Sequence, residues 1–275
     1  EIEGSKRPQI SCDTLIKEGM VIKTKGGNID EVKRSILELE LINHPVDCPI
    51  CDQAGECDLQ DQTKNFGSDY SRFFFNKRGV EDKNCGPLIK TIMTRCIHCT
   101  RCVRFSSEVA GLDYLGTFNR GTSTEIGNYV SKMFKSEISG NIIDLCPVGA
   151  LISSDFQYTA NAWELSKVPA TCAHCSSGCS LNYEVKHAGI SNPFENKITR
   201  VTNDFEFTAI CGAGRFGFEF ENKSAGKDET KLNNAVEAIK SSEAIKFNSY
   251  ITNEEALILQ KLKDELGIKL VNRDA

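Results

Sequence analysis

Cysteines are the main candidates for chemistry in this sequence, because 13 of the 275 residues are cysteine and most of them are clustered. Eleven of these cysteines and one histidine divide into three groups of four. Thiolate sulfur and neutral imidazole nitrogen are protein ligands of iron-sulfur clusters and of structural zinc. The grouping therefore predicts metal binding, with these two kinds of centre as alternatives.

The second group along the chain, called the second set, has the most specific spacing. It consists of Cys96, Cys99 and Cys102, and of Cys146, which Pro147 follows. Three cysteines at x2 spacing let one turning loop reach three corners of a cubane cluster, and a remote Cys-Pro pair supplies the fourth, as in ferredoxin motifs. Zinc sites more often use two separated Cys-x2-Cys pairs. We therefore predict that the second set binds a 4Fe-4S cluster.

The third set has a less exclusive pattern, with spacings of x2, x3 and x31: Cys172, Cys175, Cys179 and Cys211. A single Cys-x2-Cys pair can also begin a zinc ribbon. The spacing favours a third 4Fe-4S cluster and leaves zinc as the alternative.

The first set contains the histidine and reads H-x3-C-x2-C-x5-C: His44, Cys48, Cys51 and Cys57. An isolated histidine is more often a cap or a core residue than a ligand. Here only three cysteines lie nearby, so a four-cornered cluster would otherwise expose one iron to water. We predict that His44 is the fourth ligand and that this neutral ligand raises the reduction potential above that of an all-cysteine site, as in Rieske centres.

Other residues that could take part in chemistry receive no ligand role. His98 and His174 fall between ligands, where side chains tend to point away from a cluster, and Cys85 is predicted to be a small buried residue. Four cations around the second set could offset thiolate charge, but a solvated basic face explains them equally well: Lys90, Arg95, Arg101 and Arg104. No nucleophile-base pair or phosphate loop stands out, so no catalytic residue is predicted.

The amino-acid composition excludes some classes of partner and of protein. Lys and Arg number 33 against 38 Asp and Glu, which gives a net charge of -5 without a long basic stretch. This balance argues against nucleic acid as a partner. No stretch approaches the roughly 18 apolar residues of a membrane-spanning helix. An odd cysteine count in a long chain also argues against a disulfide framework.

The elements that position these residues are predicted from local signals. Residues 1–27 should form two short strands around a turn at 4–8, closed by Gly26-Gly27. Asn28 with Glu31 should cap a helix that ends before Pro45. Residues 48–65 are polar and should form a loop around a metal centre instead of an apolar core.

The C-terminal part has a different periodicity. After a polar linker at 222–228, residues 244–251 should form a buried strand. Thr252 with Glu255 should cap a helix that Gly267 ends, and 268–271 should be a parallel strand. This pattern predicts the start of an α/β domain.

Three long blocks carry a resemblance to a known family: HPVDCPICDQAGECDLQDQ at 44–62, MTRCIHCTRCVRF at 93–105 and SGNIIDLCPVGA at 139–150. In these blocks the chain resembles the large iron-sulfur subunit, the 75 kDa type, of respiratory NADH:quinone oxidoreductase (complex I). The resemblance covers about residues 1–222 and is weaker beyond. It implies a bacterial-type member truncated at both ends.

The family resemblance implies an electron relay. Electrons from NADH, oxidised at a flavin in a partner subunit, would pass through the clusters toward a smaller iron-sulfur subunit and quinone. The subunit would be peripheral on the cytoplasmic face of a bacterial inner membrane, or on the matrix side in a mitochondrion. Its other partners would be peripheral-arm subunits of the complex.

Further cofactor assignments also come from the resemblance. Ser11-Cys12-Asp13-Thr14 matches the last ligand region of a 2Fe-2S domain, so Cys12 would be its fourth ligand, with the other three upstream of Glu1. That 2Fe-2S cluster would exist in the full-length subunit only. The third set resembles the cluster that opens molybdopterin oxidoreductases and is typical of some bacterial members, yet no molybdopterin is expected.

The predicted fold class is α+β with several small cluster modules. Five modules are expected: a remnant of a 2Fe-2S ferredoxin-like domain at 1–27, a 4Fe-4S domain with one histidine ligand at 28–67, a 4Fe-4S ferredoxin-like domain at 68–164, a molybdopterin-oxidoreductase-type 4Fe-4S domain at 165–222, and the start of an α/β molybdopterin-oxidoreductase-like domain at 223–275. Two alternatives stay open: the electron-input module of a formate dehydrogenase or hydrogenase, and a zinc-stabilised scaffold.

Overall fold

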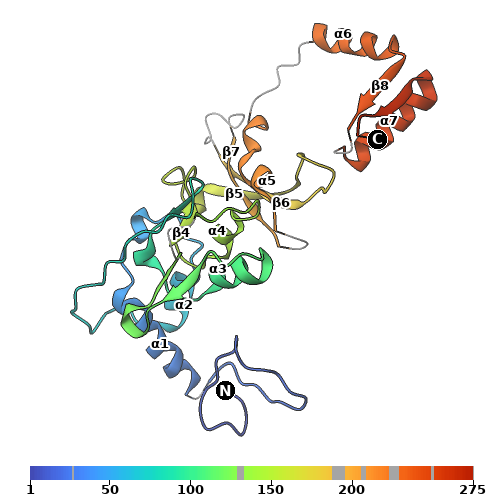
Figure 1. Ribbon diagram of the computed structural model, residues 1–275. Coiled ribbons are helices and arrows are strands. Elements are labelled where there is room, and N and C mark those ends of the chain that lie inside the picture. Colours follow the sequence, from blue (N-terminus) through green and yellow to red (C-terminus); the bar gives the residue numbers. More distant parts are fainter. Residues whose placement is uncertain are drawn as a thin grey trace. The chain divides into compact units, whose positions relative to one another are not determined.

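The computed structural model describes residues 1–26, 28–128, 133–187, 196–205, 209–222, 229–248 and 251–274. Helices and strands alternate irregularly along the chain, which confirms the predicted α+β class (Figure 1). The chain divides into two compact units, Glu1–Phe134 with Leu145–Ala162, and Lys135–Asp144 with Trp163–Ala275. In the described part of the chain, no helix has the length and apolar character needed to cross a membrane.

The first unit begins with a segment that has almost no core. The two predicted strands reduce to one antiparallel bridge between Ile2 and Ile22. Leu15 and Ile16 are 85% and 84% exposed, so no apolar surface holds the segment in a sheet. Gly26 has a φ of +81°, as a closing turn requires, whereas Gly27 lies outside the described residues.

Helix α1 (Ile29–Asn43) begins and ends where the sequence predicted, with His44 at its C-cap. The predicted cap is wrong in its chemistry, because the side chain of Asn28 makes no capping hydrogen bond and its backbone is already helical. Ile29 and Leu37 are buried, and α1 packs on α2 (Asp58–Phe66).

Helix α2 corrects the loop predicted for 48–65. Asp58 and Asp61 in its first turn and Lys64 in its last turn suit the helix dipole, and the side chain of Leu59 is buried. Only the residues before it, with the short 3₁₀ turn η1 (Cys48–Ile50), follow the predicted irregular path. The polar composition of this segment therefore belongs to a helix with one narrow buried face and not to a loop.

The rest of the first unit is built from short elements around two small sheets. Strand β1 (Ile89–Thr91) pairs antiparallel with β4 (Leu151–Ser153), and β2 (Gly116–Phe118) with β3 (Glu125–Gly127). Between them lie four helical segments: η2 (Met93–Arg95), α3 (Arg101–Arg104), the π-helical η3 (Phe105–Val109) and η4 (Gly121–Ser123). The buried apolar residues here include Ile89, Met93, Phe105, Ile126, Val148, Leu151 and Ile152.

The second unit is organised by a three-stranded antiparallel sheet in the order β5-β6-β7, drawn in yellow to orange in Figure 1. Its strands are β5 (Leu165–Thr171), β6 (Ser180–Lys186) and β7 (Lys197–Asn203), and η6 (Ala162–Glu164) precedes them. Helices α5 (Gly212–Phe216) and η7 (Phe218–Phe220) contact β7. Helix α4 (Asn141–Leu145) contributes all but its last residue to this unit.

The C-terminal elements are α6 (Glu229–Lys240), β8 (Ala244–Phe247), α7 (Asn253–Leu266) and β9 (Lys269–Asn272). The capping box of Thr252 and Glu255, the left-handed Gly267 and the parallel pairing of β8 with β9 confirm the prediction. Strand β8 alternates between exposed and half-buried residues, so the expected buried strand is wrong. Helix α6 was not predicted, and of the predicted linker only Asn222 lies within the described residues.

Candidate metal centres

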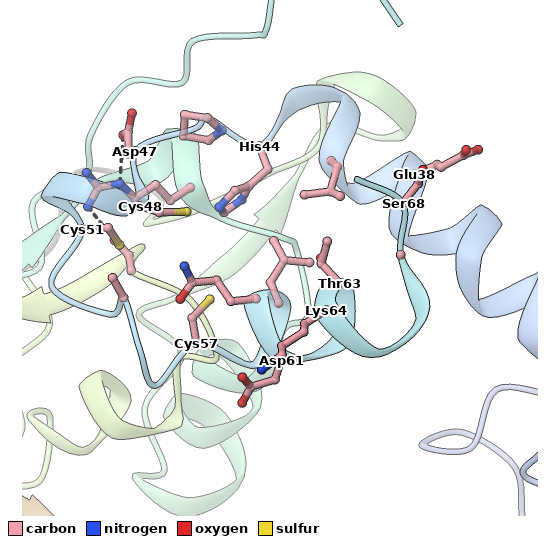
Figure 2. A pocket seen from close by; sticks show the side chains of 18 of the residues that line it. Glu38, His44, Asp47, Cys48, Cys51, Cys57, Asp61, Thr63, Lys64 and Ser68 are labelled. Carbon is pink, nitrogen blue, oxygen red and sulfur yellow. Dashed lines mark hydrogen bonds and ion pairs between the residues drawn. The ribbon is translucent and has the colours of Figure 1, made fainter. Parts of the chain in front are cut away.

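The four residues of the first set surround one cavity. His44 follows α1, Cys48 begins η1, Cys51 follows η1 and Cys57 is the N-cap of α2. All four line a pocket of about 900 Å³, and Figure 2 shows their side chains around the same space. The two helices and the turn between them therefore gather residues that the sequence grouped by spacing alone.

The imidazole of His44 is suited to bind a metal. Its Nδ1 atom is buried and has no hydrogen-bond partner. Burial lowers the pKa of His44, and the positive charges of Lys77 and Arg95 lower it further, which favours the neutral ring. A buried polar atom without a partner costs about 1–3 kcal/mol, and a neutral ring nitrogen is the form that binds metal. The donor set thus fits an iron centre in this pocket.

Arg95 is a site residue to which the sequence pattern alone assigns no role. It is only 3% exposed, so the solvated face offered as an alternative is wrong for this residue. Its Nε donates to Oδ2 of Asp47 at 3.0 Å, and both residues line the pocket of the first set. One feature of the sequence could have indicated that these two residues belong to the sites. Each directly precedes a candidate ligand, Arg95 before Cys96 and Asp47 before Cys48.

Gly149 is a second site residue that the sequence pattern did not reveal. A Cβ at this position would lie 2.2 Å from the sulfur of Cys51. The same turn of the chain is bound to α2, because the N–H of Asp58 donates to the carbonyl of Pro147 at 3.0 Å. The Cys146-Pro147 turn of the second set therefore forms part of the wall of the first site.

The four cysteines of the second set also line one cavity, of about 20 Å³, with Ile126, Val148 and Leu151 among its apolar walls. Burial raises the pKa of Cys102 to about 12, and the neighbouring Cys146, Cys96 and Cys99 contribute in the same direction. Burial raises the pKa of Cys146 to about 11. Deprotonation of thiols packed in this way is therefore unfavourable, and a bound metal would supply the positive charge that offsets it.

The loop between the cysteines of the second set has an unusual backbone. His98 and Thr100 have φ values of +54° and +60°, a region that non-glycine residues rarely adopt. The N–H of His98 donates to the sulfur of Cys96 at 3.4 Å. The backbone of His98 therefore contacts the sulfur of a candidate ligand.

The third set gathers at one end of the sheet in the second unit. Cys172 follows β5 and Cys179 precedes β6, and the N–H of Cys172 donates to the carbonyl of Cys179 at 2.9 Å. Burial raises the pKa of Cys172, with further contributions from Cys179, Cys211 and Cys175. The thiols of Cys175, Cys179 and Cys211 therefore lie near the thiol of Cys172.

The surroundings of the third set are partly apolar. Cys172 belongs to a buried cluster with Leu181, Val201 and Ile210. A Cβ on Gly214 would lie 3.2 Å from the sulfur of Cys172, so the first turn of α5 approaches this sulfur closely. The ring of His174 stands edge-on to Phe220 with the centroids 5.5 Å apart.

The two remaining cysteines differ in their surroundings. Cys85 is 4% exposed and burial raises its pKa to about 11, which confirms the predicted small buried residue. Cys12 is exposed in the N-terminal segment, and its ligand role stays a prediction. All 13 cysteines are free thiols. Among the described residues, no three His, Cys, Asp or Glu side chains form a site for a single metal ion.

Comparison with protein families gives two matches. Residues 33–72 match the NADH-ubiquinone oxidoreductase-G iron-sulfur binding region, and residues 86–152 match the ferredoxin-like domain of NADH-quinone oxidoreductase subunit 3. The first range contains the whole first set and the second range the whole second set. The third set lies outside both.

Curated relatives agree with these matches. The chain is 46% identical to the NADH-ubiquinone oxidoreductase 75 kDa subunit of Reclinomonas americana, over 86% of this chain and 33% of the relative. It is 58% identical to the protein of the same name from Acanthamoeba castellanii, over 58% of this chain and 24% of the relative. The mitochondrial NADH dehydrogenase [ubiquinone] iron-sulfur protein 1 of Solanum tuberosum is 57% identical over 60% of this chain and 22% of its own length.

One solved structure completes the comparison. A chain of the NAD+-reducing [NiFe]-hydrogenase in the H2-reduced state has a TM-score of 0.48 and 25% identity, over 58% of this chain and 69% of that one. The present chain spans a third or less of the length of its curated relatives. Over 86% of its own length the chain is similar to a 75 kDa subunit of NADH-ubiquinone oxidoreductase, and residues 33–72 and 86–152 match iron-sulfur regions of such subunits.

Proposed function

We propose that this chain is the cluster-carrying part of an NADH:quinone oxidoreductase subunit and relays electrons from an NADH-reduced flavin toward quinone. The observation that carries the proposal is the first site, where three thiols and a buried, unpartnered imidazole nitrogen line one pocket. The identity to 75 kDa subunits supports the assignment to this enzyme.

The ligand sets follow the three groups of the sequence. We assign one 4Fe-4S cluster each to the first set of His44, Cys48, Cys51 and Cys57, the second set of Cys96, Cys99, Cys102 and Cys146, and the third set of Cys172, Cys175, Cys179 and Cys211. A cluster bound in such a site takes up and releases a single electron. The modules 28–67, 68–164 and 165–222 would each hold one centre.

The residues around the first site have separate tasks. The thiolates and His44 bind iron, and the neutral imidazole leaves the centre less negative than four thiolates would. Arg95 adds positive charge at the wall of the pocket, where its ion pair with Asp47 holds it in place. Gly149 leaves room for the sulfur of Cys51.

The wider assembly is part of the same proposal. The partners are a flavin-containing subunit that oxidises NADH and other peripheral-arm subunits. The location is peripheral, on the cytoplasmic face of a bacterial inner membrane or on the matrix side in a mitochondrion. In the full-length subunit, Cys12 would supply the fourth ligand of a 2Fe-2S cluster. We propose no molybdopterin for this chain.

Analysis of metal and acid-labile sulfide tests the function directly. We expect about 12 irons and about 12 sulfides per chain from three four-iron clusters. Paramagnetic resonance of the dithionite-reduced protein should resolve three centres. Zinc without sulfide, in a folded and colourless protein, would refute electron transfer and favour the structural scaffold.

A further inference from the structure

Two polar residues of α4, the buried Asn141 and the partly buried Asp144, precede Cys146 in the block that carries the second set. By sequence they belong with that set. By their contacts, residues 135–144 belong to the second unit, which contains the third set. This segment therefore lies against a different group of cysteines from the one that its sequence block suggests.

Asn141 binds the residue directly before Cys211. Its side chain is fully buried, at 0% exposure. The Nδ2 atom donates to the carbonyl of Ile210 at 2.8 Å, and Oδ1 accepts from the N–H of Ile210 at 3.2 Å. Both backbone polar groups of Ile210 are thus bonded to one side chain.

The residue directly after Cys211 is held by the same segment. The N–H of Gly212 donates to the carbonyl of Glu137 at 2.7 Å. Cys211 is therefore fixed on both sides, and both contacts come from residues 135–144. The side chain of Glu137 is exposed and takes no part in this bond.

Asp144 fixes the helix that Cys211 begins. Both terminal guanidinium nitrogens of Arg215, Nη1 and Nη2, donate to its carboxylate, and Arg215 is only 4% exposed. The N–H of Arg215 donates to the carbonyl of Cys211 at 3.0 Å, within the first turn of α5. The side chain of Arg215 also packs closely against Gly140, where an added Cβ would lie 2.7 Å from Cδ of Arg215.

We propose that Asn141 and Asp144 are positioning residues for the third centre, and that they place Cys211 as its remote ligand. The proposal rests on the proposed function, in which the third set binds a cluster. Cys211 lies 32 positions after Cys179, so no local turn can set its place. Side chains that orient a ligand from outside the metal's first layer typically change metal affinity 10–100-fold when they are replaced.

The test uses Asn141→Ala and Asp144→Asn in the full-length subunit within its purified complex, with Cys211→Ser as the reference for a lost third centre. Both variants should weaken or remove the resonance signal of the third centre and leave the signals of the first and second. The iron content should fall by about four atoms per complex. Asp144→Asn keeps the size of the side chain, so it stays informative where Asn141→Ala disturbs folding.

The matched control is Glu137→Gln, which keeps the carbonyl that binds Gly212 and should leave all three signals unchanged. The proposal is overturned when both variants retain the third signal at full intensity with an unchanged midpoint potential. It is also overturned when Asp144→Asn weakens all three signals equally, because the residue would then support the fold as a whole. A wild-type protein without a third signal would instead refute the assignment of the third set.

Discussion

The chemistry of the first site depends on two side chains of opposite character, a neutral imidazole and a buried guanidinium. In the proposed centre His44 would supply a ligand without charge, and Arg95 would supply charge without being a ligand. Both make the reduced, more negative state of a cluster easier to form. The two effects on the reduction potential can be measured separately. The effect of His44 depends on a bond to iron, whereas the effect of Arg95 is electrostatic and needs no bond.

Replacing His44 tests the ligand. We expect His44→Cys to retain the first cluster and to lower its midpoint potential, because a charged thiolate replaces a neutral nitrogen. A redox titration followed by paramagnetic resonance measures the shift. His98→Cys is the control, since the bond from His98 to Cys96 is made by its backbone N–H. An unchanged potential in His44→Cys would show that the imidazole is not bound to iron.

Replacing Arg95 tests the charge. A charge interaction worth about 1–2 kcal/mol across roughly 8–16 Å corresponds to about 40–90 mV for one electron. We expect Arg95→Gln to lower the potential of the first centre by an amount of this order in the same titration. Arg101→Gln is the matched control, because Arg101 also directly precedes a cysteine but its side chain is 53% exposed and its pair with Asp58 is screened by water. Equal shifts in both variants would contradict a special role for Arg95.

Among the elements, the turn after Cys146 has the most consequences, because it joins β4 to the second set and also lies against the first site. Its bond from Asp58 to Pro147 links it to α2. The spacing of the cysteines predicted each site separately. It could not predict this shared turn, since the residues involved are far apart in the sequence.

Gly149→Ala tests this turn. The added methyl group would lie 2.2 Å from the sulfur of Cys51, so the backbone or the cysteine must move. We expect the signal of the first cluster to be lost or changed, although Gly149 belongs to the sequence block of the second set. Resonance spectra of the reduced protein show which centre responds. Gly79→Ala is the control, because no atom lies within 4 Å of a Cβ there. Normal spectra for Gly149→Ala would refute the close contact.

The elements also show what the sequence could and could not predict. Helix α7 was predicted from end to end, because its capping box and its Gly267 are local signals. Helix α2 was missed because one buried leucine among polar residues gives little periodicity, and its support comes from α1. The buried position of Arg95 depends on Asp47, which lies 48 residues earlier. The ligand sets were grouped by spacing, whereas the residues that hold them come from contacts between distant segments.

At the scale of the whole molecule, the apolar core is thin around the first set. Within residues 44–66, the buried side chains are Asp52, Ala54, Cys57 and Leu59. The burial of so few apolar residues gains too little free energy to offset the conformational entropy that the segment loses when it becomes ordered. Metal binding must then contribute much of the local folding free energy.

Removal of the clusters tests this view. We expect a protein treated with an iron chelator under reducing conditions to lose protection from proteases within residues 44–66 and 96–105. Mass spectrometry of the fragments locates the cuts. Reconstitution with iron and sulfide should restore protection, whereas zinc alone should not. An iron-free chain with the original fragment pattern would show that the polypeptide folds here unaided.

The turn at Pro147 and Gly149 has a consequence for how the protein matures. Because it closes the second site and at the same time forms a wall of the first, delivery of a cluster to either one prepares the backbone of the other. A cell that builds this chain should therefore accumulate molecules with both of these centres or with neither, and half-filled intermediates should be short-lived.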